Sequence, residues 1–408
     1  MGEPAVSVII PTYNRRDELR QTLEALTAQE FPTAEFEVIV ADDGSSDGSA
    51  EVAASFDGPL RLTYAWQEDL GYRAAAARNF GARHATAPIF AFLDCGTLAG
   101  PGFVAGHLAA HSVPGRRAVL GYCYGYDALR GEKWVPDSFG TVSLPELVRR
   151  NSDDPRFQDI RHGEFERAGF DVMKFALPWA HYATMNCSMR AEDFWAVGGF
   201  DEMFKSWGME DTELGYRLYH HGLVLTLSLD AWTVEAPIDR AIKRRLGSPM
   251  RNARMFHDKF PEPSVELVVD GLRNLELDTL QADAAMLAHW TEQARELDVA
   301  AEIESALREL PAGASVVVFG CGGSVPASLP ATSLLDFDAA LLAKATADGR
   351  HTGYHAIGLR TWLAADSADA VIVTSRLRGL WPRYGERITA EAQRVGRRVL
   401  GASATSSP

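Results

Sequence analysis

The order of elements in residues 1–45 constrains the fold of this chain more than any other feature of its sequence. Residues 6–10 (VSVII) form an apolar, β-branched run without helical spacing that stops at Pro11, which is typical of a buried parallel strand. The leucines of residues 16–27 share one helical face, and residues 36–41 form a second strand that ends in an acidic turn. Strand, helix, strand and acidic turn open a doubly wound α/β sheet, in which ligands gather at the carboxyl ends of the strands.

The alternation of strands and helices continues beyond this turn. Residues 60–66 predict a third strand, residues 73–85 a helix, and residues 89–93 a fourth strand that ends on Asp94. Between residues 122 and 179 the periodicity weakens, and charged, Gly and Pro residues accumulate. We expect a long variable insertion there, over the carboxyl ends of the strands.

A second series of strands begins after Pro311. Residues 315–319, 334–337 and 370–373 predict strands, and a glycine turn (GCGG) occupies residues 320–323. These features favour a small Rossmann-like domain. The turn lacks the full GxGxxG pattern and a clear acidic partner, so it is a weak nucleotide signal, and a tight strand-to-helix turn is the preferred interpretation.

The sequence therefore predicts an α/β protein in three parts. Residues 1–262 form the first α/β domain, residues 263–310 a helical connector, and residues 311–402 the small Rossmann-like domain, whose role the sequence does not reveal. Apolar residues spaced along one helical face between residues 277 and 287 support the connector.

Charge and hydropathy exclude several classes of partner. The 408 residues carry a formal net charge of −15, which opposes a nonspecific grip on nucleic acid or on an anionic membrane. No apolar segment approaches the ~20 residues of a membrane-spanning helix, and the N-terminus lacks the features of a signal peptide. The four cysteines are scattered without a CxxC pair, so we expect reduced thiols. We expect a cytoplasmic protein without a membrane span or nucleic-acid partner, and a homo-oligomer is compatible with the sequence.

Five segments in register carry a resemblance to a known family. They are VSVIIPTYN (6–14), ADDGSSDG (41–48), DLGYRAAAARNFG (69–81), FLDCG (92–96) and GGFDEMFKSWGMEDTELGYRL (198–218). Together they resemble the inverting family 2 glycosyltransferases of GT-A fold, and they are similar to the catalytic domains of chondroitin polymerase and of β-1,4-galactosyltransferases. The resemblance covers about residues 5–260, which implies that the first domain is a GT-A glycosyltransferase catalytic domain.

The resemblance implies a donor site at the carboxyl ends of the strands. In the family the first loop and the acidic turn hold the base and ribose, and Asp43 is suited to accept a hydrogen bond from a ring N–H. Arg78, followed by Asn79, looks like the family's donor-facing pair, because a guanidinium pairs with diphosphate oxygens at two points. Purely structural interpretations of the same residues are that the Asp-Gly turn only caps a helix and that the arginine lies in solvent on the surface of its helix. The implied donor residues are Pro11, Thr12, Tyr13, Arg15, Asp42, Asp43, Arg78 and Asp94.

A divalent cation commonly neutralises the diphosphate that leaves during sugar transfer. GT-A enzymes usually supply a DxD motif for it, but residues 94–96 read DCG, so the second carboxylate is missing. The histidine that often follows the ED motif in the family is also not obvious here, and Glu235 and His257 are the candidates to replace it. The resemblance leaves Asp94 as a ligand for Mn²⁺ or Mg²⁺, alone or with Glu235. The alternative is neutralisation without a metal, by Arg78, Lys174 or Arg190.

The segment WGMED (207–211) holds the strongest catalytic candidates. Inverting transfer requires a base that takes the proton from the acceptor hydroxyl as it attacks the anomeric carbon. The resemblance assigns this role to Asp211, the orientation of the acceptor to Glu210, and a wall or stacking surface for the sugar to Trp207. Alternatively, two carboxylates at a helix start only favour the helix dipole.

The resemblance thus implies an inverting hexosyltransferase. It would move a hexose or amino sugar from a nucleotide sugar, with UDP favoured, to a hydroxyl of a soluble acceptor, either a small natural product such as an aminocyclitol or a saccharide. A nucleotidyltransferase would need a glycine-rich, basic loop after the first strand, and residues 11–14 (PTYN) are not one. Two alternatives stay open: a sugar-binding or nucleotide-binding protein without turnover, and a peptide glycosyltransferase.

Overall fold

The computed structural model describes residues 2–127, 134–237, 247–274 and 279–401. The chain divides into two compact units, Met1–Asn252 and Ala253–Pro408, which are described separately. Their boundary lies before residue 262, where the sequence places the end of the first domain, and the helices of the predicted connector belong to the second unit. The three-part division stays a prediction.

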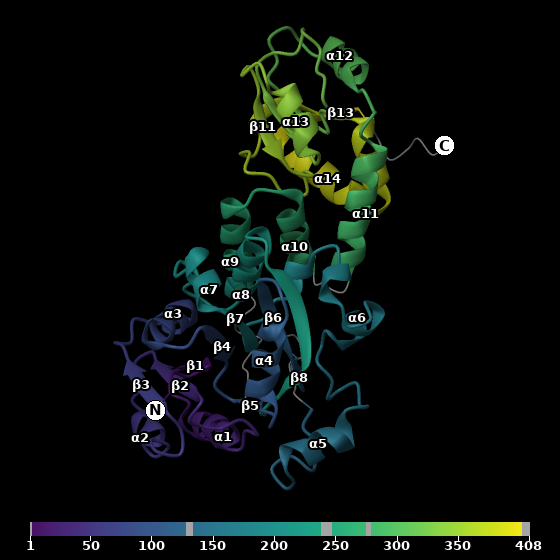
Figure 1. The fold of residues 1–408 in the computed structure, drawn as a ribbon. Coiled ribbons are helices and arrows are strands. Elements are labelled where there is room, and N and C mark those ends of the chain that lie inside the picture. The colour runs from purple at the N-terminus through teal and green to yellow at the C-terminus, as the bar shows by residue number, and fades with distance from the viewer. Residues whose placement is uncertain (1, 128–133, 238–246, 275–278, 402–408) are drawn as a thin grey trace. The chain divides into compact units, whose positions relative to one another are not determined.

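One eight-stranded mixed sheet forms the centre of the first unit. Its strands are β1 (Val6–Thr12), β2 (Phe36–Asp42), β3 (Leu62–Trp66), β4 (Ile89–Leu93), β5 (Thr97–Ala99), β6 (Arg117–Tyr124), β7 (Asn186–Arg190) and β8 (Val224–Glu235). Their order in the sheet is β3-β2-β1-β4-β7-β6-β8-β5 (Figure 1). β1 to β4 are parallel, β7 runs antiparallel to β4 and β6, and β8 is parallel to β6 but antiparallel to β5. The expected α/β sheet is confirmed.

The helices of the first unit connect these strands. They are α1 (Arg16–Thr27), α2 (Ser49–Ala54), α3 (Ala74–His84), α4 (Phe103–Ser112), α5 (Leu144–Asn151), α6 (His162–Arg167), α7 (Ala191–Ala196) and α8 (Glu210–His220), with the short 3₁₀ helices η1 (Val172–Lys174) and η2 (Pro178–His181). In the insertion predicted between residues 122 and 179, the described chain holds the end of β6, followed only by short helices and irregular segments. Along the described parts of the chain, no helix is long and apolar enough to cross a membrane.

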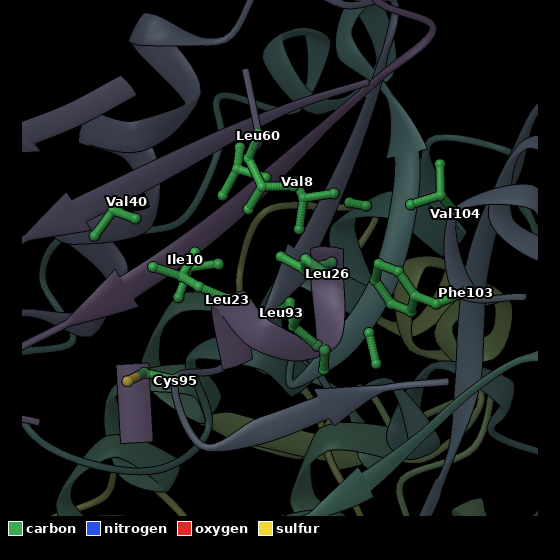
Figure 2. Packing of buried hydrophobic residues seen from close by; sticks show 14 of the residues in the cluster. Val8, Ile10, Leu23, Leu26, Val40, Leu60, Leu93, Cys95, Phe103 and Val104 are labelled. Atoms are coloured by element: carbon green, nitrogen blue, oxygen red, sulfur yellow. The ribbon is translucent and has the colours of Figure 1, made fainter. Parts of the chain in front are cut away.

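The main core of the first unit lies between α1, α4 and one face of the sheet. Figure 2 shows Leu23 and Leu26 of α1 close to Val8 and Ile10 of β1, and Phe103 of α4 belongs to the same buried cluster. All five side chains are fully buried, and each such side chain stabilises the fold by about 1.5–3 kcal/mol. This core therefore holds β1 in place, and with it the loop that follows its carboxyl end.

Helix α3 covers the opposite face of the sheet, and Gly81 sets its approach. A Cβ atom at Gly81 would lie 2.6 Å from Cγ2 of Ile9 and 3.0 Å from Cβ of Ala41. We expect Gly81→Ala to lower the free energy of unfolding by about 1–3 kcal/mol, the usual cost of overpacking a core. Urea unfolding followed by circular dichroism measures this loss. Gly163→Ala in α6 is the control, because its Cβ would meet only Nη1 of Arg167 at 3.7 Å; an equal loss in both variants would refute the steric explanation.

The second unit contains a five-stranded sheet in which every pair is parallel. Its order is β11-β10-β9-β12-β13, so the predicted Rossmann-like sheet is confirmed. The strands are β9 (Val316–Phe319), β10 (Ser333–Asp336), β11 (Thr352–His355), β12 (Ala368–Val373) and β13 (Gly396–Gly401). The helices are α9 (Gly247–Lys259), which begins in the first unit, α10 (Pro263–Asn274), α11 (Leu280–Gln293), α12 (Ala300–Arg308), α13 (Ala339–Ala345), η5 (Ser375–Leu380) and α14 (Trp381–Val395).

The glycine turn after β9 differs from its sequence-based interpretation in two ways. It has an acidic partner, because the N–H of Gly322 donates to Oδ2 of Asp336 at 2.8 Å. The same oxygen accepts a hydrogen bond from Nε of Arg376 at 2.7 Å, and both side chains are fully buried. In addition, the segment that joins β9 to β10 contains no helix, so the turn is not a strand-to-helix turn. A dinucleotide site of the Rossmann type places the pyrophosphate at such a helix start, and this turn lacks one.

Candidate active site

Loops at the carboxyl ends of β1 and β2 are joined by hydrogen bonds. The N–H of Asp43 donates to the carbonyl oxygen of Thr12 at 2.9 Å. The N–H of Asn14 donates to Oγ of Ser45 at 2.8 Å, and Oδ1 of Asn14 accepts from the N–H of Ser46 at 2.9 Å. Asn14 adopts a left-handed conformation with φ of 48°, which asparagine tolerates better than most residues. These hydrogen bonds thus fix the loops after β1 and β2 relative to each other.

The two aspartates of the acidic turn have different surroundings. Asp42 is fully buried, and its carboxylate accepts hydrogen bonds from the N–H groups of Gly44 and Ser45 and from the hydroxyl of Tyr64. These bonds shape the turn and leave the Asp42 carboxylate little capacity for a ligand. Oδ1 of Asp43 instead accepts from long side chains of the neighbouring loop.

Asp43 is held by two residues that the sequence analysis did not select. Nε2 of Gln67 and Nη2 of Arg73 each donate to Oδ1 of Asp43 at 2.6 Å. Burial raises the pKa of Asp43, and the bonds from both partners lower it. Arg73 lies in the quoted DLGYR segment, which was a signal for it, whereas Gln67 had none. Among the described donors none bonds Oδ2 of Asp43, so this oxygen suits a ligand.

The other predicted residues of the first loop differ in exposure. The Tyr13 ring is 46% exposed, and its hydroxyl donates to Oδ2 of Asp69 at 2.8 Å. Thr12 is buried with its hydroxyl 3.6 Å from Sγ of Cys95, and Pro11 lies within β1. Arg15 directly precedes α1 and faces Glu18 of that helix at 3.8 Å. Tyr13 is therefore the side chain of this loop that offers a surface to a flat ring.

A second cluster of charges centres on Arg78 of α3. Nη2 of Arg78 donates to Oδ1 of Asp94 at 2.7 Å, and Nη1 lies 3.7 Å from Oε1 of Glu210. The Arg78 side chain is only 5% exposed, and its Nε and Nη1 atoms have no hydrogen-bond partner in the described structure. Burial opposes its charge, but Asp94 and Glu210 raise the pKa of Arg78. The cluster thus keeps a permanent buried cation with unused donors.

Glu210 and Asp211 begin helix α8 after two residues with positive φ. Gly208 has φ of 100° and Met209 has φ of 75°; a bulky residue in this conformation is strained and such strain clusters at functional sites. Glu210 is buried, and its Oε2 has no hydrogen-bond partner. Oδ1 of Asp211, which is partly exposed, accepts from the N–H of Thr212 at 2.8 Å. The pair thus presents acceptor oxygens at the start of α8.

The electrostatics of this pair suit a proton acceptor. Burial raises the pKa of Glu210, and the charge of Asp211 raises it further. Burial also raises the pKa of Asp211, while the Thr212 N–H and Arg78 lower it. Two adjacent carboxylates with raised pKa values beside a buried guanidinium are typical of general acid–base chemistry.

Two asparagines, Asn252 and Asn79, fix the segment that precedes α8. Asn252 is fully buried, and its Nδ2 donates to the carbonyl oxygens of Ser206 at 2.8 Å and Gly208 at 2.6 Å. Asn79, which the resemblance places beside the donor, bonds the backbone of Phe200 through both its amide nitrogen and its amide oxygen, each at 2.9 Å. Trp207, predicted as a wall for the sugar, is partly buried on this segment.

The three predicted metal ligands lie in different surroundings. Asp94 is 39% exposed at its side chain and bonds Arg78. Glu235 is buried at the end of β8, where its backbone pairs with Thr97 of β5. His257 belongs to the second unit, where its ring centroid lies 4.4 Å from that of Trp362. Within the described ranges no group of three His, Cys, Asp or Glu side chains is arranged to hold a metal ion.

Comparison with known families and proteins yields several matches. The model described as Glycosyl transferase family 2 matches residues 7–177, and the model described as N-terminal domain of galactosyltransferase matches residues 166–234. The chain is 41% identical over 407 residues to the Validoxylamine A glucosyltransferase of Streptomyces hygroscopicus subsp. limoneus, with 97% of this chain and 90% of that protein covered. It is 30% identical over 232 residues to the chondroitin synthase of Escherichia coli, with 53% and 32% covered.

The comparison with solved structures also yields matches. The crystal structure of S. aureus TarS 1-349 in complex with UDP-GlcNAc matches with a TM-score of 0.46 and 18% sequence identity, covering 67% of this chain and 71% of that chain. The two matched family spans together include Asp43, Arg78, Asp94, Glu210 and Asp211. Both clusters described above therefore lie inside the matched part of the chain.

Proposed function

We propose, on the premise that this chain belongs to glycosyltransferase family 2, that it transfers glucose from a nucleotide sugar to a hydroxyl of an aminocyclitol with inversion at the anomeric carbon. One observation carries the catalytic part of the proposal: the Glu210–Asp211 pair with raised pKa values beside the buried Arg78 guanidinium. The sugar and the acceptor class rest on the 41% identity to Validoxylamine A glucosyltransferase, which spans 97% of this chain and so includes its second unit. Nothing in the site favours a peptide acceptor.

The donor would lie across the two clusters. The free Oδ2 oxygen of Asp43 would accept a hydrogen bond from the base or ribose, and the exposed Tyr13 ring would face the base. The unbonded Nε and Nη1 atoms of Arg78 would donate to the diphosphate oxygens. A buried cation that is held in a fixed position beside the diphosphate stabilises the negative charge that develops on the leaving group.

Asp211 would act as the general base. The acceptor oxygen forms a bond to the anomeric carbon while the bond from that carbon to the diphosphate breaks, and the diphosphate leaves with the electron pair. The proton of the acceptor hydroxyl passes to the Asp211 carboxylate. Glu210 would orient the acceptor through Oε2, the oxygen without a partner in the described structure, and Trp207 would line the acceptor side.

The residues near Asp94 fit a divalent cation with few protein ligands. The Asp94 side chain is 39% exposed and lies beside Arg78, where the diphosphate is expected. Mg²⁺ commonly binds through one or two carboxylates together with substrate phosphates. The Asp94 carboxylate would therefore suffice as the protein ligand, and Glu235 is the candidate for a second one. A bound cation would supply further charge neutralisation of the leaving diphosphate. The basic surroundings of His257, described below, suit an anion better than a cation.

Calorimetry with the purified chain tests the donor. UDP, GDP and their glucose conjugates are titrated with Mn²⁺, with Mg²⁺ and with EDTA, and we expect one glucose conjugate to bind, more tightly with metal than with EDTA. The preferred donor is then incubated with validoxylamine A, and NMR of the product reads the anomeric configuration. A β-glucoside from an α-linked donor supports the proposal; donor binding without any product would instead establish a binding protein without turnover.

The pH dependence of transfer should report the carboxylate pair. A general base must be ionised, and burial raises the pKa of Asp211, so kcat/KM should fall with decreasing pH at a midpoint above about 4, the ordinary value for Asp. Glu210→Gln removes a neighbouring negative charge and should move this midpoint to lower pH. Initial rates at saturating donor between acidic and neutral pH measure both midpoints. The same midpoint in both proteins would mean that the two carboxylates do not interact.

A further inference from the structure

The second unit contains a pocket to which the proposed glycosyl transfer assigns no role. It is a cavity of about 160 Å³ between α9, α10 and the loop after β11, and we call it the arginine pocket. Its lining includes Arg254 and His257 from α9, and Arg360 and Trp362 from the loop. Pockets for drug-sized ligands start at about 300 Å³, so this cavity suits a compact group rather than a whole nucleotide.

His257 supplies an unused polar atom in the arginine pocket. The side chain is only 4% exposed, and its Nε2 atom is buried without a hydrogen-bond partner in the described structure. A buried polar atom without a partner is costly, and a ligand that accepts from an Nε2–H group would remove that cost.

Two of the charged residues that line the cavity are arginines, Arg254 and Arg360. Burial lowers the pKa of Arg360, the charges of Arg254 and Arg273 lower it further, and the charge of Glu391 raises it. No carboxylate of the described residues forms an ion pair with any of these three arginines, although surface arginines elsewhere in this unit, such as Arg295 and Arg308, have partners. Like charges held close together are unfavourable, and an anion bound between Arg254 and Arg360 would relieve their repulsion.

Two buried glutamates hold the loop that presents Arg360. The Glu266 carboxylate accepts hydrogen bonds from four successive backbone N–H groups, those of residues 357–360, at 2.6 to 3.1 Å. Oε1 of Glu391 accepts from the N–H and the hydroxyl of Thr361 at 2.6 and 2.7 Å. The loop is therefore fixed before any ligand arrives, and preorganisation of this kind favours binding.

We propose that the arginine pocket binds a small tetrahedral oxyanion, either inorganic phosphate or the phosphate group of a sugar monoester. Arg254 and Arg360 would donate charge-assisted hydrogen bonds to its oxygens, and Nε2 of His257 would donate a third. The one acidic side chain in the lining, Asp258, has Oδ1 occupied by Nε1 of Trp362 at 2.8 Å. This bond holds the Trp362 ring, 36% exposed, at the cavity edge, where it would cover the ring of a sugar phosphate.

Titration calorimetry of the full chain with potassium phosphate at constant ionic strength tests the proposal. We expect saturable binding, and we expect Arg254→Gln and Arg360→Gln each to weaken it about tenfold, the loss of one charge-assisted hydrogen bond. Arg308→Gln on α12, an exposed arginine paired only with Glu304 at 3.6 Å, is the matched control and should bind phosphate like the unmodified chain. Arg254 is exposed, so its replacement by Gln should leave folding unchanged, and thermal unfolding of each variant without phosphate checks this.

Two further experiments identify the site that binds phosphate and the anion that the arginine pocket prefers. The titration is repeated in Arg78→Lys, where phosphate bound in the donor site would weaken but phosphate in the arginine pocket would not. The affinity for glucose 1-phosphate is compared with that for phosphate in the unmodified chain and in Trp362→Leu. If glucose 1-phosphate binds more tightly than phosphate and Trp362→Leu removes this difference, the ligand is a sugar phosphate. If both bind equally well, the ligand is inorganic phosphate. No binding of either anion, or binding that survives both arginine changes, overturns the proposal. Phosphate binding in the arginine pocket and sugar transfer are measured separately, so either proposal can be refuted without the other.

Discussion

Asp211→Asn should lower kcat by about 10²–10⁴-fold, the usual contribution of a general base, and leave donor affinity unchanged. The amide keeps the size of the carboxylate and its bond to the Thr212 N–H through Oδ1, but it cannot take the acceptor proton. Stability should not fall, because the change removes one of two adjacent charges at the start of α8 whose pKa values burial raises. Single-turnover rates of transfer, together with donor titration by calorimetry, separate chemistry from binding.

Asp230→Asn is a matched control for this experiment. Asp230 is an exposed aspartate of β8, so the same chemical change there should leave kcat within experimental error. Glu210→Gln should impair the reaction less than Asp211→Asn, since Glu210 is proposed to orient the acceptor rather than to accept its proton. If Asp211→Asn retained most of its activity and Glu210→Gln did not, the two roles would have to be exchanged.

The strands, and the strand ends at which the candidate site lies, could be predicted because the sequence signals for them are local in the chain. β1, β2 and β4 are apolar runs that stop at polar turns, and parallel strands bring such turns to one edge of the sheet. The resemblance named Arg78 and Asp94 as donor residues, and the structure joins them at 2.7 Å. Their roles stay proposals, and because Arg78 belongs to α3, their contact depends on the packing of that helix against the sheet.

Partners supplied from elsewhere in the chain could not be predicted in this way. Gln67 reaches Asp43 only because β3 lies beside β2, and Asn252 holds Gly208 across 44 residues of sequence. The acidic partner of the glycine turn, Asp336, was missed for the same reason: its carboxylate meets the turn through the pairing of β9 with β10. A short motif specifies the conformation of its own backbone, whereas these contacts depend on which strands become neighbours.

Arg78→Met should lower kcat/KM by at least about 10²–10³-fold, the usual loss when one preorganised donor to a developing charge is removed. It should also lower the free energy of unfolding by about 3–5 kcal/mol, because Glu210 would then be a buried charge without a cation. Arg83→Met is the control on the same helix: Arg83 is 52% exposed and faces Glu202 at 3.8 Å, so both losses should be small there. Urea unfolding and steady-state kinetics measure the two effects.

The pH dependence of the stability loss tests its cause. Arg78 lowers the pKa of Glu210, which burial raises, so removing Arg78 raises that pKa further in the folded state. A carboxyl group with a raised folded pKa favours the folded state in its protonated form, and this contribution is lost as pH rises. The difference between Arg78→Met and the unmodified chain should therefore be smallest at acidic pH and increase toward pH 8.

A second substitution separates stability from catalysis. Adding Glu210→Gln to Arg78→Met removes the unpaired buried charge, so the double variant should recover most of the lost stability and lose the pH dependence of the defect. Its activity should stay low, because the donors that face the diphosphate are still absent. Recovery of activity together with stability would show that Arg78 only supports the fold around Glu210. The diphosphate would then need another cation, and a divalent metal ion bound by Asp94 would be the first candidate.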